Sequence, residues 1–206
     1  MYRVIAYVDG YNLYYGLRAK GWKSLYWLDI RSLVRNLVKP DQYLVHTKYF
    51  TARVSSTAAD PRKSKRQGTY LEALETLPDF SIYYGHYLPK LVACHKCGSV
   101  WVTHEEKMTD VNIAVELLSD AYEDAFDTAL LVSGDSDLSG AVQRTQALFS
   151  GKRVVVAFPP ARASERLRNL ATASFTIGRA ILAKSLFPPV LTKADGYRLC
   201  KPPEWN

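Results

Sequence analysis

The sequence predicts an α/β protein in which helices cover both faces of a mostly parallel sheet. Short apolar runs of strand length alternate with segments of helical periodicity along the chain, and this alternation is typical of βαβ units. The length of 206 residues suits one domain of this class. Two of the apolar runs end in aspartates, and open α/β sheets bind ligands outside the carboxyl ends of their strands.

The expected elements follow in order along the chain. Apolar, β-branched and aromatic runs predict strands over residues 3–8, 43–50, 80–88, 128–133, 153–158 and 174–178. Helical periodicity and turn residues predict helices over 13–19, 29–38, 60–77, 109–122, 138–148, 163–171 and 179–185.

Two of these helices have informative sequences. Asp60 and Pro61 are good start signals for the third helix, as an N-cap and a first helical residue. Thr109 is the expected cap of the fourth. Apolar residues with the spacing i, i+3, i+4, i+7 and i+11 then mark one face of that helix: Val111, Ala114, Val115, Leu118 and Tyr122. We expect Glu116, on another face, to be solvated.

The predicted organisation is one domain over 1–187, with a small insert at about 91–104, and a tail over 188–206. The tail contains two Pro-Pro pairs and is expected to be extended. Hydrophobic content is 48%, and the net charge of +7 favours an anionic partner, although an ordinary basic surface is the alternative.

The composition also bears on the cellular compartment. No apolar stretch approaches the roughly 20 residues that span a bilayer, and the first apolar run is too short for a signal peptide. The three cysteines do not form a disulfide framework. We expect a cytoplasmic protein.

Four aspartates are candidates for one acidic pocket: Asp9, Asp110, Asp135 and Asp137. Two carboxylates about 4 Å apart repel by roughly 4 kcal/mol at an effective dielectric near 20. Such a group therefore needs a cation, a shared proton or a basic neighbour, and oxygen ligands suit Mg²⁺ or Mn²⁺. This chemistry indicates metal-assisted reactions of phosphates.

Each aspartate also has a structural alternative. Asp9 can cap the helix that follows it, and Asp110 is stabilised by a helix dipole whatever its function. One of Asp135 and Asp137 is expected to be an N-cap. Asp135 is the better candidate ligand, and Asp137 is expected to act through water or as that cap.

Three sequence blocks resemble those of the NYN domain, a family of the PIN-like nuclease superfamily. They are Val8-Asp9-Gly10-Tyr11-Asn12, Lys107-Met108-Thr109-Asp110-Val111 and Leu131-Val132-Ser133-Gly134-Asp135-Ser136-Asp137. The resemblance covers roughly residues 1–180 and implies a PIN-like three-layer α/β fold with a divalent-metal site that cuts phosphodiester bonds, usually in RNA. Carried over, it makes the four aspartates the metal-holding set and Asn12 and Ser133 polar helpers.

Cys94-His95-Lys96-Cys97-Gly98 has the pattern of half a zinc knuckle. Structural zinc requires four ligands. The remaining ligands are expected from His86, His95 and His104, or from a second pair of cysteines in a homodimer. The alternative is two reduced cysteines in a hairpin. Cys200 is expected to be a free thiol.

Two basic groups are candidates for binding phosphates of RNA. The first is Arg62, Lys63, Lys65 and Arg66, and the second is Lys152, Arg153, Arg162, Arg166 and Arg168. Lys107 is expected to lie near phosphate or to balance the acids. Tyr11 and Tyr14 are candidates for stacking on unpaired bases. The alternatives are solvated helix faces for the basic groups and core positions for the tyrosines.

Together these features predict a ribonuclease that uses Mg²⁺ or Mn²⁺ and direct attack by water on single-stranded RNA. One rival is a non-catalytic RNA-binding or assembly module with a vestigial metal site. A second rival is a phosphohydrolase of small nucleotides.

Overall fold

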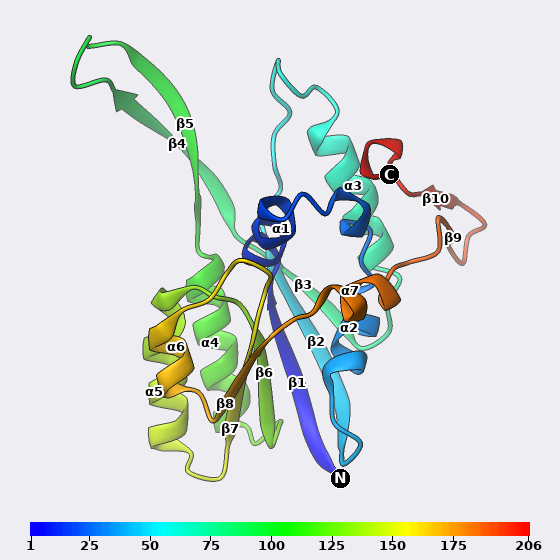
Figure 1. The fold of residues 1–206 in the computed structure, drawn as a ribbon, viewed down its shortest axis with the longest axis vertical. Coiled ribbons are helices and arrows are strands. Elements are labelled where there is room, and N and C mark those ends of the chain that lie inside the picture. Colours follow the sequence, from blue (N-terminus) through cyan, green and yellow to red (C-terminus); the bar gives the residue numbers. More distant parts are fainter.

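The computed structural model describes the backbone of residues 1–206 and the side chains of 1–86, 91–100 and 107–206. Its centre is a six-stranded parallel sheet in the order β3-β2-β1-β6-β7-β8 (Figure 1). The strands are β1 Tyr2–Asp9, β2 Gln42–Thr51, β3 Phe80–Tyr84, β6 Thr128–Val132, β7 Arg153–Phe158 and β8 Ala173–Thr176. The predicted α/β class with a mostly parallel sheet is confirmed.

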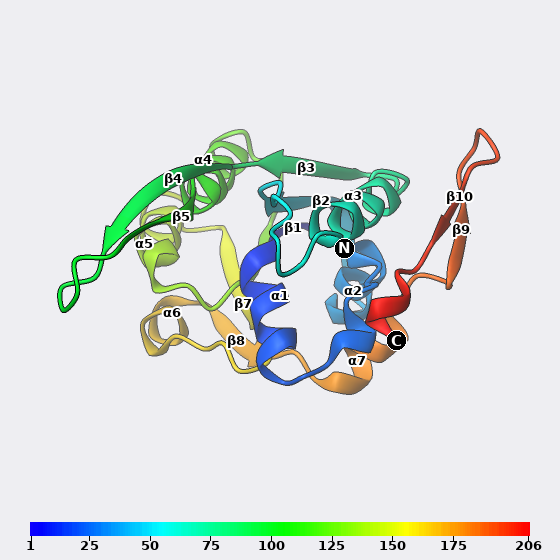
Figure 2. The ribbon, with the colours of Figure 1, turned by 90° about the horizontal axis from the view of Figure 1, so that it is seen from above.

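Seven helices cover the two faces of the sheet (Figure 2). One face packs against α1 Gly10–Ala19, α2 Ile30–Leu37, α3 Lys63–Leu74 and α7 Arg179–Lys184. The other packs against α4 Thr109–Tyr122, α5 Ser139–Leu148 and α6 Glu165–Leu170. The result is three layers with a hydrophobic core on each side of the sheet, consistent with a PIN-like fold.

The central strand β1 supplies both cores. Val4, Ala6 and Val8 pack on the side of α1, and Ile5 and Tyr7 pack on the side of α4. A strand buried on both faces is expected to be apolar at every position, and this explains the uninterrupted apolar run before Asp9.

The strand order reverses between β1 and β6. Successive strands are added outward from β1 through β2 and β3, and the chain then returns to place β6 on the other side of β1. Val8 pairs with Val132, so Asp9 and Ser133 follow neighbouring strands at the same edge. Such reversal points are where open α/β sheets bind ligands.

The segment after β3 departs from the prediction. The strand predicted over 80–88 ends at Tyr84, and β4 His86–Ala93 then pairs antiparallel with β5 Val100–Lys107. This hairpin projects from the body (Figure 1) and is longer than the insert predicted at 91–104. Its register begins at His86 opposite Lys107, so the hairpin returns the chain to the start of α4.

The predicted start of α3 was wrong. The helix begins at Lys63, after Arg62, and it ends at Leu74 rather than residue 77. The Asp60 carboxylate forms an ion pair with Arg66 instead of accepting a hydrogen bond from a helix N–H. Asp60 therefore pairs with the Arg66 guanidinium and does not cap the helix.

The predicted apolar face of α4 is not the face that packs on the core. Val111, Val115 and Tyr122 are 51%, 54% and 82% exposed. The buried set is Ile113, Leu117 and Ala121, whose spacing of four residues is also helical. The helix begins at Thr109, and Met108, with a φ of 80°, precedes it as the cap residue.

The sequence did not indicate this buried face, because the acidic residues Glu116 and Asp120 lie next to it on the helix. Asp120 is 7% exposed and accepts hydrogen bonds from the Tyr7 hydroxyl at 2.5 Å and from Lys48 Nζ at 2.8 Å. Glu116 accepts from the same ammonium at 2.7 Å, so its predicted solvation was wrong. Lys48 on β2 thus allows two carboxylates to pack beside the core.

The tail after residue 188 is not wholly extended. It forms a small hairpin of β9 Val190–Thr192 and β10 Arg198–Cys200. Trp205 then packs on Tyr26, Trp27 and Tyr70, with ring centroids 5.8, 6.3 and 6.0 Å away. Among the described residues, none of the helices has both the length and the apolar character needed to cross a membrane.

The two faces of α4 should respond differently to truncation. Leu117→Ala should lower the free energy of unfolding by about 2–5 kcal/mol, because Leu117 is 1% exposed and its loss leaves a cavity. Val115→Ala should change it by less than about 0.5 kcal/mol. Chemical denaturation of both variants measures the difference, and equal losses would contradict this assignment of the core face.

Candidate active site at the carboxyl ends of β1 and β6

Asp9 is the central residue of the candidate site. It ends β1, is 4% exposed and caps α1. Its Oδ1 accepts a hydrogen bond from the Asn12 N–H at 2.9 Å, and its Oδ2 accepts one from the Ser133 hydroxyl at 2.9 Å. The predicted capping role is therefore present, and the two oxygens join β1, α1 and the loop after β6.

Asn12 and Ser133 hold the loop after β6 against Asp9. The Asn12 side-chain oxygen accepts from the Gly134 N–H at 2.9 Å, and Ser133 Oγ accepts from the Asp135 N–H at 3.0 Å. A Cβ at Gly134 would lie 2.8 Å from the Arg162 backbone, so only glycine permits this packing. These hydrogen bonds fix the position of Asp9, and the predicted role of Asn12 and Ser133 as polar helpers stays a prediction.

Asp135 and Asp137 have different environments. Asp135 is half-buried, and its Oδ1 accepts from the Asp137 N–H at 3.0 Å to cap the short 3-10 helix Ser136–Leu138. Asp137 is exposed. Of the two, Asp135 is therefore the cap as well as the aspartate nearer to the buried site.

Electrostatics connect three of the aspartates. Burial, the largest effect, and the negative charges of Asp110 and Asp135 raise the pKa of Asp9 to about 7, whereas the hydrogen bonds from Asn12 and Ser133 oppose the rise. Asp110 is half-buried in the first turn of α4. Its charge and that of Asp135 are near enough to disfavour the ionised form of Asp9.

The carboxylates of Asp9, Asp110 and Asp135 are ligands of the type that a divalent cation prefers, but they are not gathered around one point. Among the residues that the structure describes, no group of three or more His, Cys, Asp or Glu side chains is gathered to hold one ion. The pKa of Asp9 is nevertheless raised, mainly by burial and further by the negative charges of Asp110 and Asp135. A hard cation with oxygen ligands is the group that would compensate it.

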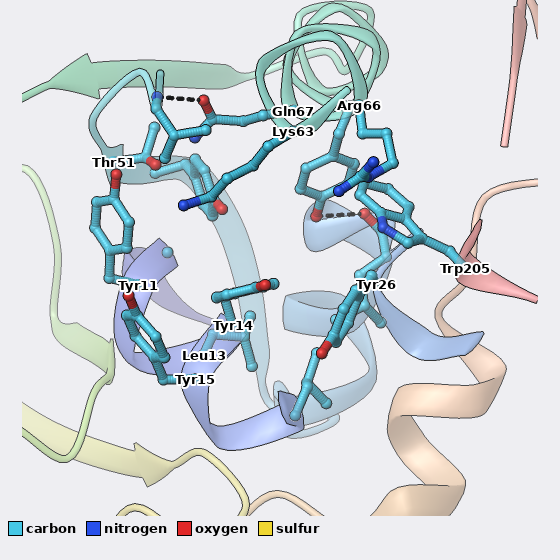
Figure 3. Close-up of a pocket in the computed structure, with 16 residues that line it drawn as sticks. Tyr11, Leu13, Tyr14, Tyr15, Tyr26, Thr51, Lys63, Arg66, Gln67 and Trp205 are labelled. Carbon is cyan, nitrogen blue, oxygen red and sulfur yellow. Dashed lines mark hydrogen bonds between the residues drawn. The ribbon is translucent and has the colours of Figure 1, made fainter. Parts of the chain in front are cut away.

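A cavity lies between α1 and α3 (Figure 3), and its lining includes Gly10, which directly follows Asp9. It contains about 850 Å³ of space between atoms, part of it open to solvent. We call it the aromatic cavity, and its lining comprises Gly10, Tyr11, Leu13, Tyr14, Tyr15, Leu17, Tyr26, Leu28, Tyr49, Thr51, Val54, Lys63, Arg66, Gln67, Tyr70 and Trp205. Tyr11 and Tyr14, the predicted stacking residues, are both in it.

The first basic group is divided by α3. Lys63 lines the aromatic cavity, Arg62 and Lys65 line a second hollow to which the tail contributes Glu204, and Arg66 lines both. Arg66 pairs with Asp60 and lies 3.5 Å from Glu204, and Arg62 lies 4.0 Å from Glu204. Part of the predicted positive charge is therefore compensated within the chain.

The second basic group does not form one surface. Lys152 pairs with Asp124, which also binds Arg3 at the start of β1. Arg162 follows the opposite end of β7 and lies 5.8 Å from the centre of the Tyr15 ring. The strand between them separates residues that are close in sequence, so Lys152 was wrongly grouped with Arg162.

The CxxC segment forms the turn of the projecting hairpin. The Cys94 N–H donates to the Ser99 carbonyl at 2.8 Å, and the Gly98 N–H donates to the Cys94 carbonyl at 2.9 Å with a φ of 71° at Gly98. Hydrogen bonds with Ser99, and another with Cys94, lower the pKa of the Cys97 thiol to about 7. These contacts bring the two thiols together in one turn.

The three histidines predicted as further zinc ligands lie at different distances along the hairpin from the cysteines. His86 begins β4, whereas Ala93 ends it before the turn, and seven residues of strand span roughly 23 Å. His86 therefore lies too far from the cysteines to share an ion with them. His95 is in the turn, and the side chain of His104 lies outside the described residues.

Comparison with known proteins identifies the family. The model of the NYN domain matches residues 3–179. A curated relative, 6-hydroxy-3-succinoylpyridine 3-monooxygenase of Pseudomonas putida, is 30% identical over 178 residues, which cover 70% of this chain and 56% of that protein. The chain thus spans just over half the length of this relative.

A solved structure shares the fold. It is a protein of unknown function from Vibrio parahaemolyticus, 22% identical, with a TM-score of 0.55 over 90% of this chain and 96% of that one.

The raised pKa of Asp9 predicts a pH dependence of stability. In protein freed of divalent cations with a chelator, the folded state keeps the Asp9 proton up to about pH 7, whereas the carboxyl ordinarily titrates near 3.8. This contribution to the free energy of unfolding is fully present below about pH 3.8 and is lost progressively as the pH rises to about 7. Thermal unfolding from pH 4 to 8 should show wild type losing stability relative to the Asp9→Asn variant.

Other carboxylates, such as Asp124 and Asp127, have lowered pKa values and make the protein more stable as the pH rises. Because wild type and Asp9→Asn share these carboxylates, the difference between their unfolding curves reports Asp9 alone. The exposed Asp41→Asn variant is the matched control. Parallel curves for wild type and Asp9→Asn would contradict the assignment.

Proposed function

Because the chain belongs to the NYN domain family, we propose that it is a divalent-metal-dependent ribonuclease that hydrolyses phosphodiester bonds. One observation carries the proposal. The buried carboxylate of Asp9 lies at the reversal point of the sheet and interacts with Asp110 and Asp135. A cation would stabilise the ionised form of an acidic site at that edge, and phosphates are natural ligands of such a cation.

Asp9, Asp110 and Asp135 would hold Mg²⁺ or Mn²⁺, with Asp137 at the exposed margin. When bound, the ion would lower the pKa of a water and compensate charge on the phosphate. Ser133 and Asn12 keep both Asp9 oxygens oriented through the hydrogen bonds at 2.9 Å. In this proposal they act as positioning residues and do not contact the RNA.

RNA would approach over the start of α4 and the outer side of α3. Lys107 is exposed three residues before Asp110, and Lys65 is exposed on α3. Cations at such places neutralise phosphates without reading bases, and the affinity they contribute falls as salt rises. Arg62 and Arg66 contribute less, because Glu204 and Asp60 already lie beside them.

A second candidate function is catalysis on a small heteroaromatic acid. The relative from Pseudomonas putida is named as a monooxygenase of a succinoylpyridine. The aromatic cavity beside Asp9 favours this candidate, since it is lined by rings and lysine rather than shaped as an open groove for a strand. The other rivals are an RNA-binding or assembly module without catalysis and a phosphohydrolase of small nucleotides.

The central test is cleavage of labelled single-stranded RNA with millimolar Mn²⁺ or Mg²⁺. Wild type should produce shorter RNA, and Asp9→Asn should slow cleavage by roughly 100-fold, the effect of about 2.7 kcal/mol in the barrier. Asp41→Asn should cleave at the wild-type rate, because Asp41 is an exposed aspartate at the other edge of the sheet.

Thermal unfolding of the same three proteins tests metal binding independently. At about 100 times its dissociation constant, the ion should add about 2.7 kcal/mol to wild type and less to Asp9→Asn. Binding of RNA without cleavage by wild type would favour the non-catalytic module. Hydrolysis of mononucleotides alone would favour the phosphohydrolase.

We further propose that Cys94 and Cys97 contribute half of a structural zinc site that a second copy of the chain completes. Protein purified without chelator should contain about one zinc per two chains, since such a site needs four ligands. Replacing both cysteines by serine should remove the zinc and the dimer, as measured by elemental analysis and light scattering. Cys200→Ser is the control, and zinc retained in the double variant would exclude the site.

A further inference from the structure

The aromatic cavity is built from segments that are far apart in the sequence. α1 supplies Tyr11, Tyr14 and Tyr15, α3 supplies Lys63, Arg66 and Gln67, and the tail supplies Trp205. Figure 3 shows these side chains around a common space. A cavity enclosed from three directions by different elements is the usual form of a small-ligand site.

Several of the surrounding rings are fixed before any ligand binds. The Tyr11 hydroxyl donates to the Ala52 carbonyl at 2.7 Å, and the Tyr70 hydroxyl donates to the Leu28 carbonyl at 2.9 Å. Trp205 is held by its ring contacts with Tyr26 and Tyr70. Because these side chains are already ordered, a ligand would lose little affinity to ordering them.

Tyr14 supplies the surface for a planar group. Its ring lies 5.3 Å from that of Tyr15 and 5.0 Å from that of Tyr26, at angles of 67° and 53°. Tyr14 is only half-buried and lies across the cavity below Lys63 (Figure 3). An aromatic ring in that space would gain offset or edge-to-face contacts with the tyrosines.

Lys63 supplies the positive charge that an anionic ligand in the cavity would contact. Its ammonium reaches over the cavity toward α1 (Figure 3), and no carboxylate of the described residues lies within ion-pair distance of it. Arg66, on the same side, already has Asp60 and Glu204 as partners. The cation available to a ligand in the cavity is therefore that of Lys63, beside an apolar and aromatic wall.

Gly10 places the cavity next to Asp9. It lines the cavity and directly follows Asp9 in the chain. A Cβ at this position would lie 2.5 Å from the Tyr49 ring and 2.8 Å from the Phe50 carbonyl oxygen. The close approach of β1 and β2 at Gly10 leaves only one residue between the cavity and the acidic site.

We propose that the aromatic cavity binds one planar heteroaromatic ring that carries an anionic group. The ring lies against Tyr14, and the anion lies at Lys63. Two sources share this chemistry, a nucleotide of RNA and a free heteroaromatic carboxylate. The proposal concerns binding alone, so it does not require that the acidic site be a nuclease.

Calorimetric titration of the full chain with four probes tests the proposal. Uridine monophosphate and nicotinate each combine a ring with an anion, uridine lacks the anion, and inorganic phosphate lacks the ring. At least one of the first two should bind ten times more tightly than both of the others, a difference of about 1.4 kcal/mol. Selective binding of uridine monophosphate identifies a nucleotide site, and selective binding of nicotinate identifies a small-molecule site.

Matched variants locate the binding. Lys63→Met should weaken the preferred probe by roughly tenfold, whereas Lys65→Met, two residues along the same helix and outside the cavity lining, should not. Tyr14→Leu should weaken it by about tenfold, because stacking on a base contributes about 1–3 kcal/mol. Tyr14→Phe keeps the ring and should retain binding, and it also shows that substitution at this position permits folding.

Three results would overturn the proposal. They are no binding of either ring-bearing anion up to about 10 mM, equal binding of uridine or phosphate alone, and equal effects of Lys63→Met and Lys65→Met. The titrations are made in protein freed of divalent cations with a chelator, so they do not depend on RNA cleavage. Probe binding without RNA cleavage in the presence of Mn²⁺ would count against the nuclease proposal alone, and cleavage without probe binding would count against the cavity proposal alone.

Discussion

The burial of one carboxylate organises the rest of the structure around it. Asp9 ends the central strand with 4% exposure, where an ionised group without partners would be strongly disfavoured. The chain supplies two donors, the Asn12 N–H at the start of α1 and the Ser133 hydroxyl after β6. Satisfying this carboxylate therefore fixes a helix and a loop that are separated by more than a hundred residues, and it orders the edge where the sheet reverses.

The same carboxylate retains an electrostatic imbalance that its hydrogen bonds do not remove. Burial is the main reason that the pKa of Asp9 is raised, and the charges of Asp110, at the start of α4, and Asp135, in the loop after β6, add to it. Asp120, in contrast, is balanced by Lys48, whose ammonium donates to it at 2.8 Å. The contrast between a neutralised and an uncompensated carboxylate distinguishes the structural cluster from the functional candidate.

The sequence was sufficient for the fold class but not for the surfaces around the candidate site. Apolar runs such as residues 4–8 identify strands because burial on both faces leaves no polar positions. Asp9 and Ser133 could be paired because the carboxyl ends of parallel strands share one edge. The face of α4 could not be identified, because Glu116 and Asp120 are balanced by Lys48 from another element. The full lining of the aromatic cavity had no local signal either, since Tyr49, Tyr70 and Trp205 converge only when the chain folds.

Fold and family do not decide between the two chemistries that the site could serve. α1 takes part in both: its first residues hold Asp9 and the loop after β6, and its tyrosines form a wall of the cavity. A molecule in the cavity would bring its anion to Lys63 and one side of its ring toward Gly10, beside the carboxylates. For RNA this arrangement would hold one base near a phosphate at the acidic edge. For a free heteroaromatic acid it would hold the ring itself beside Asp9. The identity of the ring-bearing ligand therefore determines which atoms face the acids, and the reaction follows from that placement.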